Sequence, residues 1–214
     1  MNKRRTIPIF PLPSLVFLPE TELPLHIFEP RYCAMVAEAW AGERIIGMTL
    51  LAPGWEEAPE PRPILDVGCA GEIISLDELE DGRFDIVLEG LYRFRVAEEI
   101  PHFPYRIAHV LEDPLTRVAS ARSRRARLVA SLDRLVSSKA PLAKLELEDA
   151  LSDEGVINQV AVQLGVSSEE GYELLTMPTV DERYDWVQRH LDSLQAKLDF
   201  LAPYRPLEPK PELN

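Results

Sequence analysis

Cysteine is scarce in this sequence, and long apolar runs are absent. The 214 residues include two cysteines, Cys33 and Cys69, and no CxxC pair. This usage argues against a disulfide scaffold and suits a reducing compartment. No apolar run approaches the roughly 20 residues that cross a bilayer. Prolines also interrupt the apolar stretch behind the N-terminal basic residues, which argues against a signal peptide. We therefore expect a cytoplasmic protein without a membrane-spanning segment.

Motifs for common enzyme chemistry are also missing. The sequence contains no Gly-Lys pair that would mark a phosphate-binding loop, and no GxGxxG, GxSxG or HExxH pattern. Its four histidines are scattered, and a barrel fold is needed to bring His102 and His109 near Cys69. Zinc requires three or four ligands in a defined geometry. We therefore expect no metal site, no cofactor and no catalytic residues.

Positive charge is scarce relative to negative charge. The chain has 23 Lys and Arg against 36 Asp and Glu, which gives a formal net charge of −13. A field of this sign repels nucleic-acid phosphates and anionic lipid. We therefore expect neither nucleic acid nor a membrane surface as a partner.

One local cluster of arginines runs against this balance. It consists of Arg117, Arg122, Arg124, Arg125 and Arg127. One interpretation is an RNA-binding helix in which Arg122, Arg124 and Arg125 contact phosphates. The other is the solvent-exposed face of a helix that buries Leu128 and Leu132. The absence of interleaved aromatic residues favours the second interpretation.

Proline usage divides the chain into two halves. The first 114 residues contain 13 of the 19 prolines and most of the β-branched and aromatic runs, whereas the remainder has helical spacing. We therefore predict a β-rich barrel over residues 1–114, a helical bundle over 115–202 and a proline-rich tail over 203–214.

The first half alternates short strand patterns with turn residues. Its clearest helix pattern is Pro30–Ala41, which begins with a proline at the first helical position and ends before Gly42. The Asp81-Gly82 pair between two strand patterns predicts a tight two-residue hairpin turn. We predict strands at residues 7–10, 15–18, 23–28, 43–51, 64–76, 83–96 and 105–111.

The second half reads as a series of capped helices. We predict helices at 115–136 and 152–165, a short helix or turn at 141–151, and capping boxes that begin at Ser167 and Thr179. The last helix carries a narrow apolar seam with spacings of four and three: Val180, Tyr184, Val187, Leu191, Leu194, Leu198 and Leu201. The seam either packs within the bundle or forms a homodimer.

The run PLHIFEPRY at residues 24–32 is the most distinctive local pattern, because prolines frame apolar residues at a turn from strand to helix. Together with residues 7–23, ERIIGMTLL (43–51) and LEDGRFDIVLEGLYRFRV (79–96), it resembles the substrate-recognition domain of Lon proteases. The resemblance covers nearly the whole chain and is strongest to small bacterial proteins that carry this domain alone. One departure is Glu20, where the family usually has a glycine, so we expect a turn there without a positive φ.

The resemblance implies an α+β fold, in which a PUA-like pseudo-β-barrel of about six strands with one helix is followed by an α-helical bundle. In full-length Lon this module captures polypeptides, while separate ATPase and protease domains carry out catalysis. The sequence holds no counterpart of those domains. We therefore expect a non-enzymatic module that binds unfolded polypeptide or a partner protein, and an adaptor role in protein quality control is one option.

Two sets of candidate site residues follow from the opening segment. Apolar residues among its prolines can grip unfolded chains if they are exposed, namely Phe10, Leu12, Leu15, Phe17 and Leu18. A groove between barrel and bundle is a second possible binding site. His26, Glu29 and Arg31 are close in sequence and either form a network that fixes the turn or, in an uncharacterised small-molecule enzyme, a catalytic group.

Overall fold

The computed structural model describes residues 3–116, 121–137 and 151–201. Within these ranges it contains six strands and five helices, which confirms the α+β class. The strands all precede the last four helices in the chain. The strands are β1 (Arg4–Leu12), β2 (Glu22–Ile27), β3 (Ile45–Leu51), β4 (Ile64–Glu78), β5 (Phe84–Ile100) and β6 (Arg106–Glu112). The helices are α1 (Pro30–Ala41), α2 (Ala121–Ser137), α3 (Asp153–Gln163), α4 (Ser168–Thr176) and α5 (Val180–Leu201).

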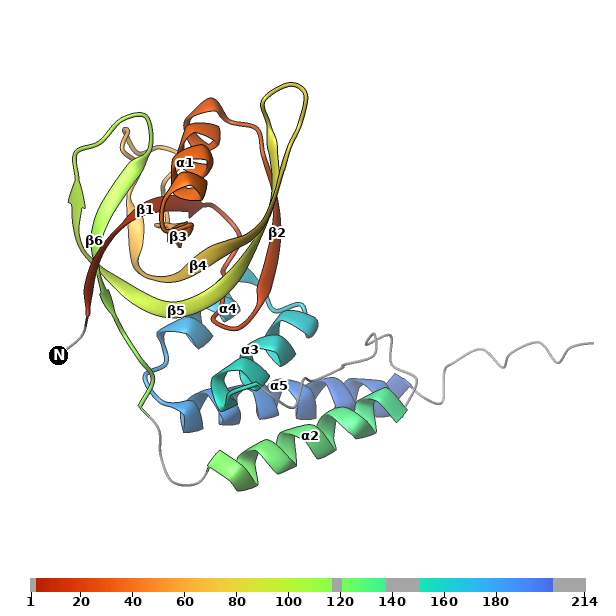
Figure 1. Cartoon of the computed structure of the whole chain (residues 1–214). Coiled ribbons are helices and arrows are strands. Elements are labelled where there is room, and N and C mark those ends of the chain that lie inside the picture. Colours follow the sequence, from red (N-terminus) through yellow and green to blue (C-terminus); the bar gives the residue numbers. More distant parts are fainter. Residues whose placement is uncertain (1–2, 117–120, 138–150, 202–214) are drawn as a thin grey trace, which may run out of the picture.

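The strands form a sheet that closes on itself. Their order is β2-β5-β4-β3-β1-β6, and an additional pairing joins β5 to β6. The long strand β5 pairs through its first half with β2 and through its second half with β6. β1 and β3 run parallel, and the other pairs are antiparallel. The result is the expected pseudo-barrel, with β2 as an edge strand that pairs with β5 (Figure 1).

β2 leaves one sheet edge unpaired in the described part of the chain, where it pairs with β5 alone. The N–H of Gly90 donates to the carbonyl of Thr21 at 2.9 Å. The backbone N–H and C=O groups of every second residue counted from Thr21 therefore point toward β5, and those of the residues between them point away. Pro24, opposite Val87, therefore faces outward from this ladder. Its ring removes a donor from the middle of the unpaired edge.

Helix α1 fills one end of the barrel. Tyr32, Met35 and Val36 are buried in a core shared with strands from both sides of the sheet. The predicted bounds of this helix are confirmed, but Gly42 has a φ of −113°. The left-handed residue is instead Arg44, at φ 62°, whose N–H donates to the carbonyl of Ala39.

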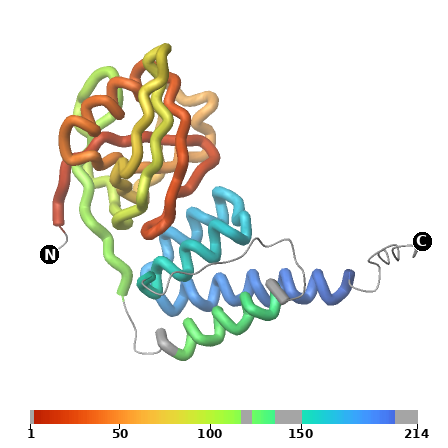
Figure 2. Tube along the Cα trace, turned by 45° about the vertical axis from the view of Figure 1, so that its right-hand side comes forward, coloured from red at the N-terminus to blue at the C-terminus, as the bar shows by residue number. Residues whose placement is uncertain are grey.

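The helical part lies against one end of the barrel. Figures 1 and 2 both place α3 and α4 next to the barrel, with α2 and α5 farther from it. The capping boxes predicted at Ser167 and Thr179 are present. The apolar seam of α5 is buried from Val180 to Leu191 against the neighbouring helices, whereas Leu201 is exposed. The seam is thus largely occupied within the chain.

Three sequence-based element assignments were wrong. Residues 15–18 form no strand, because Phe17 and Leu18 enter the core while the backbone crosses over β5. The β4–β5 turn contains three residues, since the N–H of Leu79 donates to the carbonyl of Arg83 and Gly82 adopts a φ of 79°. Residues 115–116 are not helical, and Thr116 pairs instead with Thr179, just before α5. The predicted elements at 141–150 and 203–214 lie outside the described residues.

Candidate functional site between barrel and helices

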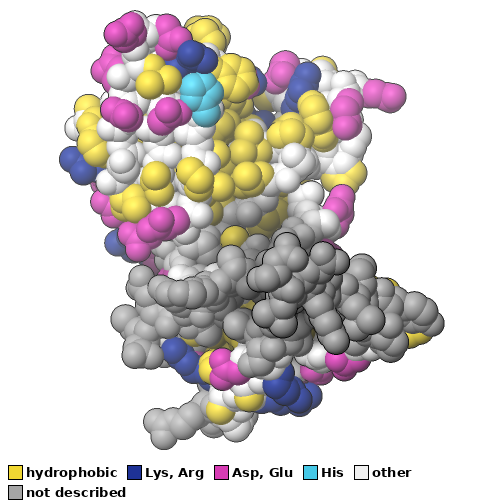
Figure 3. All heavy atoms as spheres, turned by 90° about the vertical axis from the view of Figure 1, so that its right-hand side faces the viewer, with side chains coloured by type: hydrophobic (Ala, Val, Ile, Leu, Met, Phe, Trp, Pro, Cys, Tyr) yellow, Lys and Arg dark blue, Asp and Glu magenta, His cyan; other side chains and the backbone are white. Residues whose placement is uncertain are grey.

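A groove lies where the barrel meets α3 and α4. Its volume is about 230 Å³. The walls come from the segment before β2, the start of β2, the end of α3 and the start of α4. The apolar residues that line it are Leu15, Val16, Phe17, Leu18, Leu23, Val162 and Val166, and the polar ones include Ser14, Thr21, Glu22, Ser167 and Ser168. Figure 3 shows apolar side chains gathered on this side of the barrel. We name this site the junction groove.

Close backbone packing sets the floor of the junction groove. Phe17 and Leu18 are buried, and the carbonyl of Leu18 accepts a hydrogen bond from the Thr21 hydroxyl at 2.8 Å. The same carbonyl lies so close to Gly90 that a Cβ there would be 2.2 Å from it. β5 therefore needs a glycine at this point for the segment to lie directly on it.

Glu20 links this segment to α3. Contrary to expectation, its φ is +56°, a left-handed conformation that a non-glycine residue adopts at a cost of about 1 kcal/mol or more. Its carboxylate accepts hydrogen bonds from the backbone N–H and the hydroxyl of Ser152, the N-cap of α3. Its own N–H donates to the carbonyl of Gly90 at 2.8 Å. These bonds hold the turn in the conformation that a glycine would adopt freely.

Further contacts from α3 fix the same turn. The Asn158 amide donates to the carbonyl of Pro19 at 2.9 Å, and Asn158 is fully buried. A Cβ at Gly155 would be 2.4 Å from the Glu20 carboxylate, so the helix can approach only because no side chain is present there. These contacts fix the end of the groove wall, at Pro19 and Glu20, against α3.

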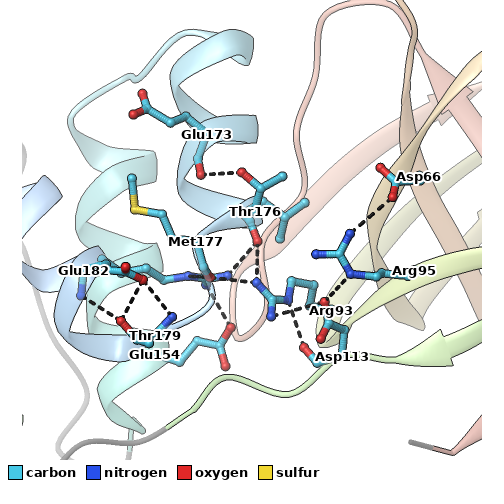
Figure 4. Close-up of polar contacts among 12 residues, drawn as sticks. Asp66, Arg93, Arg95, Asp113, Glu154, Glu173, Thr176, Met177, Thr179 and Glu182 are labelled. Atoms are coloured by element: carbon cyan, nitrogen blue, oxygen red, sulfur yellow. Dashed lines mark hydrogen bonds and ion pairs between the residues drawn. The ribbon is translucent and has the colours of Figure 1, made fainter.

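Two buried arginines join barrel and helices away from the junction groove (Figure 4). Arg93, on β5, donates to the carbonyls of Leu175 and Met177 at 2.9 and 2.7 Å. Arg183, on α5, donates to the same two carbonyls at 2.8 and 3.4 Å. These carbonyls end α4, where helix carbonyls lack partners and the helix dipole favours cations.

Carboxylates balance the two guanidinium groups. Asp113 lies 3.3 Å from Arg93, and Glu154 lies 3.0 Å from Arg183. Burial lowers the pKa of Arg183 to about 10, which leaves it cationic at neutral pH. Burial also raises the pKa of Glu154, and the nearby Arg183 partly offsets this effect. The network places four charged side chains between β5, α3, α4 and α5.

The predicted apolar residues divide between three places. Leu15, Phe17 and Leu18 line the junction groove, but Phe17 and Leu18 are almost fully buried and form its floor. Phe10 belongs to the barrel core, where its ring lies 4.2 Å from that of Tyr32. Leu12 lines a different pocket at the barrel end. The five residues therefore do not form one exposed patch.

His26, Glu29 and Arg31 do not converge. The Nδ1 of His26 is 2.6 Å from the Asp85 carboxylate, and its other ring nitrogen is 3.2 Å from Arg83. Glu29 and Arg31 pair with each other at 2.9 Å. All of these side chains are substantially exposed, so His26, Glu29 and Arg31 do not form one buried network.

The arginine cluster on α2 is largely paired with acidic residues. Arg124 forms ion pairs with Asp181 and Asp185 of α5, and Arg125 lies 3.6 Å from Asp153. The side chain of Arg122 and all of Arg117 lie outside the described residues. These pairs join α2 to its neighbours and reduce the positive field that an RNA site requires.

His102, His109 and Cys69 do not come together at one site. The Nδ1 of His102 contacts the carbonyl of Tyr105, and that of His109 contacts the Thr6 hydroxyl. Cys69 is fully buried in the core. No group of three or more His, Cys, Asp or Glu side chains suited to a metal ion occurs in residues 3–116, 121–137 and 151–201.

Sequence reasoning missed the helical wall of the groove and the buried arginines. Val162 was not predicted to be special, because its neighbours on α3 point to the core while it stays 49% exposed. A valine that lies off the buried face of α3 is a weak signal of this kind. Arg93 lies within the β5 pattern YRFRV, where alternation alone does not distinguish a buried arginine from an exposed one.

Comparison with known proteins decides the family. The model of the ATP-dependent protease La (LON) substrate-binding domain matches residues 6–193. The chain belongs to the LON substrate-binding domain family. Its fold is similar to the N-terminal domain of Mycobacterium avium complex Lon protease, with a TM-score of 0.68, 14% identity and coverage of 88% of this chain and 98% of that one. A Lon N-terminal domain protein from Xanthomonas campestris has a TM-score of 0.59 at 22% identity, with coverage of 90% and 98%.

The LON-family relatives are much longer proteins. Lon protease 2 of Bdellovibrio bacteriovorus is 26% identical over 194 residues, which is 87% of this chain and 24% of that protein. Lon protease 1 of Herpetosiphon aurantiacus is 30% identical over 151 residues, 66% of this chain and 18% of that protein. The chain thus spans about a quarter or less of these relatives. None of its described helices combines the length and apolar character needed to cross a bilayer.

Proposed function

We propose that the protein is a non-catalytic, cytoplasmic module that binds unfolded polypeptide segments in the junction groove. The observation that carries this proposal is an apolar cleft on a rigid wall, in a chain whose family is described as substrate-binding. Adaptor activity in protein quality control is the role that this binding would serve.

The groove suits a short apolar stretch of an extended chain. Its volume of about 230 Å³ accommodates a few side chains rather than a folded domain. Apolar walls supply the affinity, and the serines at the rim can bond to the backbone of a bound segment. Such a site selects for exposed apolar residues and against folded surfaces, since folded proteins rarely expose contiguous apolar segments.

The test is binding of a fluorescently labelled, permanently unfolded protein, such as carboxymethylated α-lactalbumin, measured by fluorescence anisotropy. Val162→Glu places a charge in the apolar groove and is expected to weaken binding at least tenfold. Ile74→Glu is the matched control, because Ile74 is 43% exposed, is also β-branched and lies outside the groove. Equal affinities of the two variants and the unmodified protein would contradict the proposal.

Labelled single-stranded RNA serves as the competing ligand in the same assay. We expect no saturable RNA binding, because carboxylates pair with Arg124 and Arg125. Saturable RNA binding that Arg124→Glu abolishes, with a steep dependence on salt, would favour the nucleic-acid alternative.

A further inference from the structure

A second pocket lies at the end of the barrel and shares no lining residue with the junction groove. Its volume is about 240 Å³. It is walled by the end of β1, the start of α1, the loop of residues 52–63 and the start of β6. We name it the arginine pocket, because three of its lining residues are Arg31, Arg62 and Arg106.

The three guanidinium groups come from different elements and converge in a chain with a net charge of −13. Arg106 is held in place, because it donates to both oxygens of Glu99 at 2.7 and 2.6 Å and to the carbonyl of Arg62 at 2.7 Å. This bond also fixes the loop that carries Arg62. Arg106 therefore forms a rigid corner of the pocket, where Glu99 balances its charge.

Arg31 and Arg62 lie on aromatic rings that orient their planes. The guanidinium carbon of Arg31 is 4.5 Å from the centre of the Tyr32 ring, and that of Arg62 is 4.7 Å from the centre of the Trp55 ring. A guanidinium stacked on a ring keeps its N–H groups directed sideways, where they can bind a planar carboxylate. Apolar surface beside them comes from Pro11, Leu12, Pro13 and Leu51.

Two carboxylates in the pocket compete for these arginines. Glu29 pairs with Arg31 at 2.9 Å, and Glu60 pairs with Arg62 at 3.3 Å. Each pair joins residues two apart and is roughly two-fifths or more exposed, so it is weak and screened by salt. Glu60 lies 3.3 Å from the Nε of Arg62, but this buried nitrogen has no hydrogen-bond partner among the described residues. In the described residues, neither terminal nitrogen of that guanidinium has an acceptor.

We propose that the arginine pocket binds a carboxylate carried on an apolar or aromatic group. The carboxylate would bond to the terminal nitrogens of Arg62 and to Arg31, while its apolar part contacts Leu12 and the Trp55 ring. A free aromatic acid and the C-terminus of a polypeptide that ends in an apolar residue share this chemistry. This site goes beyond the proposed groove function and does not depend on it.

The test is a calorimetric titration with N-acetyl-phenylalanine and with its amide, which lacks the carboxylate. We expect the acid to bind at least tenfold more tightly than the amide, and Arg62→Gln and Arg31→Gln each to weaken the acid at least fivefold. Equal binding of acid and amide, or no binding of either, would overturn the proposal. Tighter binding of phenethylamine than of the acid would also overturn it, because the glutamates would then be the recognising groups.

Arg83→Gln is the matched control. Arg83 pairs with Asp81 two residues earlier, is 46% exposed like Arg31, and lies outside the pocket. Arg83→Gln should leave the affinity for the acid unchanged. If it weakened acid binding as much as Arg62→Gln does, the effect would come from net charge alone, and the proposal would be overturned. Urea unfolding of each variant verifies that the fold is retained, and Trp55→Leu provides a second variant of the same pocket.

Two peptides that end in phenylalanine, one with a free C-terminus and one amidated, distinguish the sources of the ligand. Tighter binding of the free peptide than of N-acetyl-phenylalanine would identify polypeptide termini as the ligand. Equal or weaker binding of that peptide would identify a free acid. Either result supports the pocket, provided that the amidated peptide binds at least tenfold more weakly than the free one.

Discussion

The junction between barrel and helices has two contrasting sides. On the closed side, Arg93 and Arg183 occupy the carbonyl end of α4 and are themselves buried. On the open side, the exposed Val162 and the half-buried Leu15 and Val166 line a groove. The closed side holds the two parts together through strong directional bonds. The open side is therefore free to expose apolar surface that the fold does not need for its own stability.

The largest expected effect tests the closed side. Arg183→Met removes a fully buried guanidinium and leaves Glu154 without its partner. We expect the free energy of unfolding to fall by about 3–5 kcal/mol, as for other broken buried pairs. Urea denaturation measures it. Arg127→Met is the control, since Arg127 is 69% exposed and 3.7 Å from Asp192, and should cost under about 0.5 kcal/mol. Equal losses of unfolding free energy in the two variants would mean that the buried arginine pair does not hold the closed side together.

The next effect concerns Glu20, which joins the open side to α3. Glu20→Ala removes the carboxylate from Ser152 but keeps a Cβ at a positive φ, so we expect a loss of about 1–3 kcal/mol. Glu20→Gly loses the same bonds but relieves the left-handed strain, and should be about 1 kcal/mol more stable than Glu20→Ala. Equal stabilities of the two variants would mean that the left-handed turn costs nothing. Glu22→Ala, an exposed neighbour, is the control.

A smaller, pH-dependent effect comes from the capping box at the rim of the groove. The hydrogen bond from the Ser167 N–H lowers the pKa of Glu170 below its ordinary value of 4.5, and His190 adds to this. The ionised form is thus favoured by folding. Its contribution is present above about pH 4.5 and is lost as the pH falls through the lowered pKa.

The corresponding variant is Glu170→Gln, which keeps the shape of the cap and removes its charge. We expect it to be less stable by under about 1 kcal/mol at pH 7, because the group is exposed and screened. The difference should vanish at acidic pH. Urea denaturation of both proteins at several pH values measures it, with Glu169→Gln as control. A difference that grows as the pH falls would show the opposite sign of linkage.

The smallest effect tests whether the groove is dispensable for folding. Val162→Glu should change the free energy of unfolding by no more than about 0.5 kcal/mol, because Val162 is 49% exposed. Thermal and urea unfolding check this. A loss above 2 kcal/mol would make Val162 part of the core, and the open side would then resemble the closed one.

Local rules predicted the elements that depend on local contacts. Pro30 at the first position and the spacing up to Ala41 gave the bounds of α1, and the Ser167–Glu170 box gave the start of α4. The family resemblance supplied the barrel. The alternation of apolar residues predicted most of the strands. It wrongly predicted a strand at residues 15–18, because these residues are buried by crossing β5 rather than by pairing in a sheet.

The candidate sites could not be predicted to the same degree, because distant residues make them. Glu20 was expected to avoid a positive φ, and its bonds to Gly90 and to Ser152, 132 residues away, hold it there. Arg62 and Arg31 come together through loop and barrel geometry that no spacing encodes. Contacts between residues so far apart in the sequence depend on the whole fold, so no short motif predicts them.

Pro24, on the unpaired edge of β2, has a consequence for self-association. The apolar surface of the groove is open to other copies of the protein, and an unpaired strand edge beside it would let such copies stack into sheets. The missing donor at Pro24 interrupts the row of hydrogen bonds at its centre. The edge next to the groove is thereby a poor template for polymerisation, so high concentrations of the protein should remain free of β-rich aggregates.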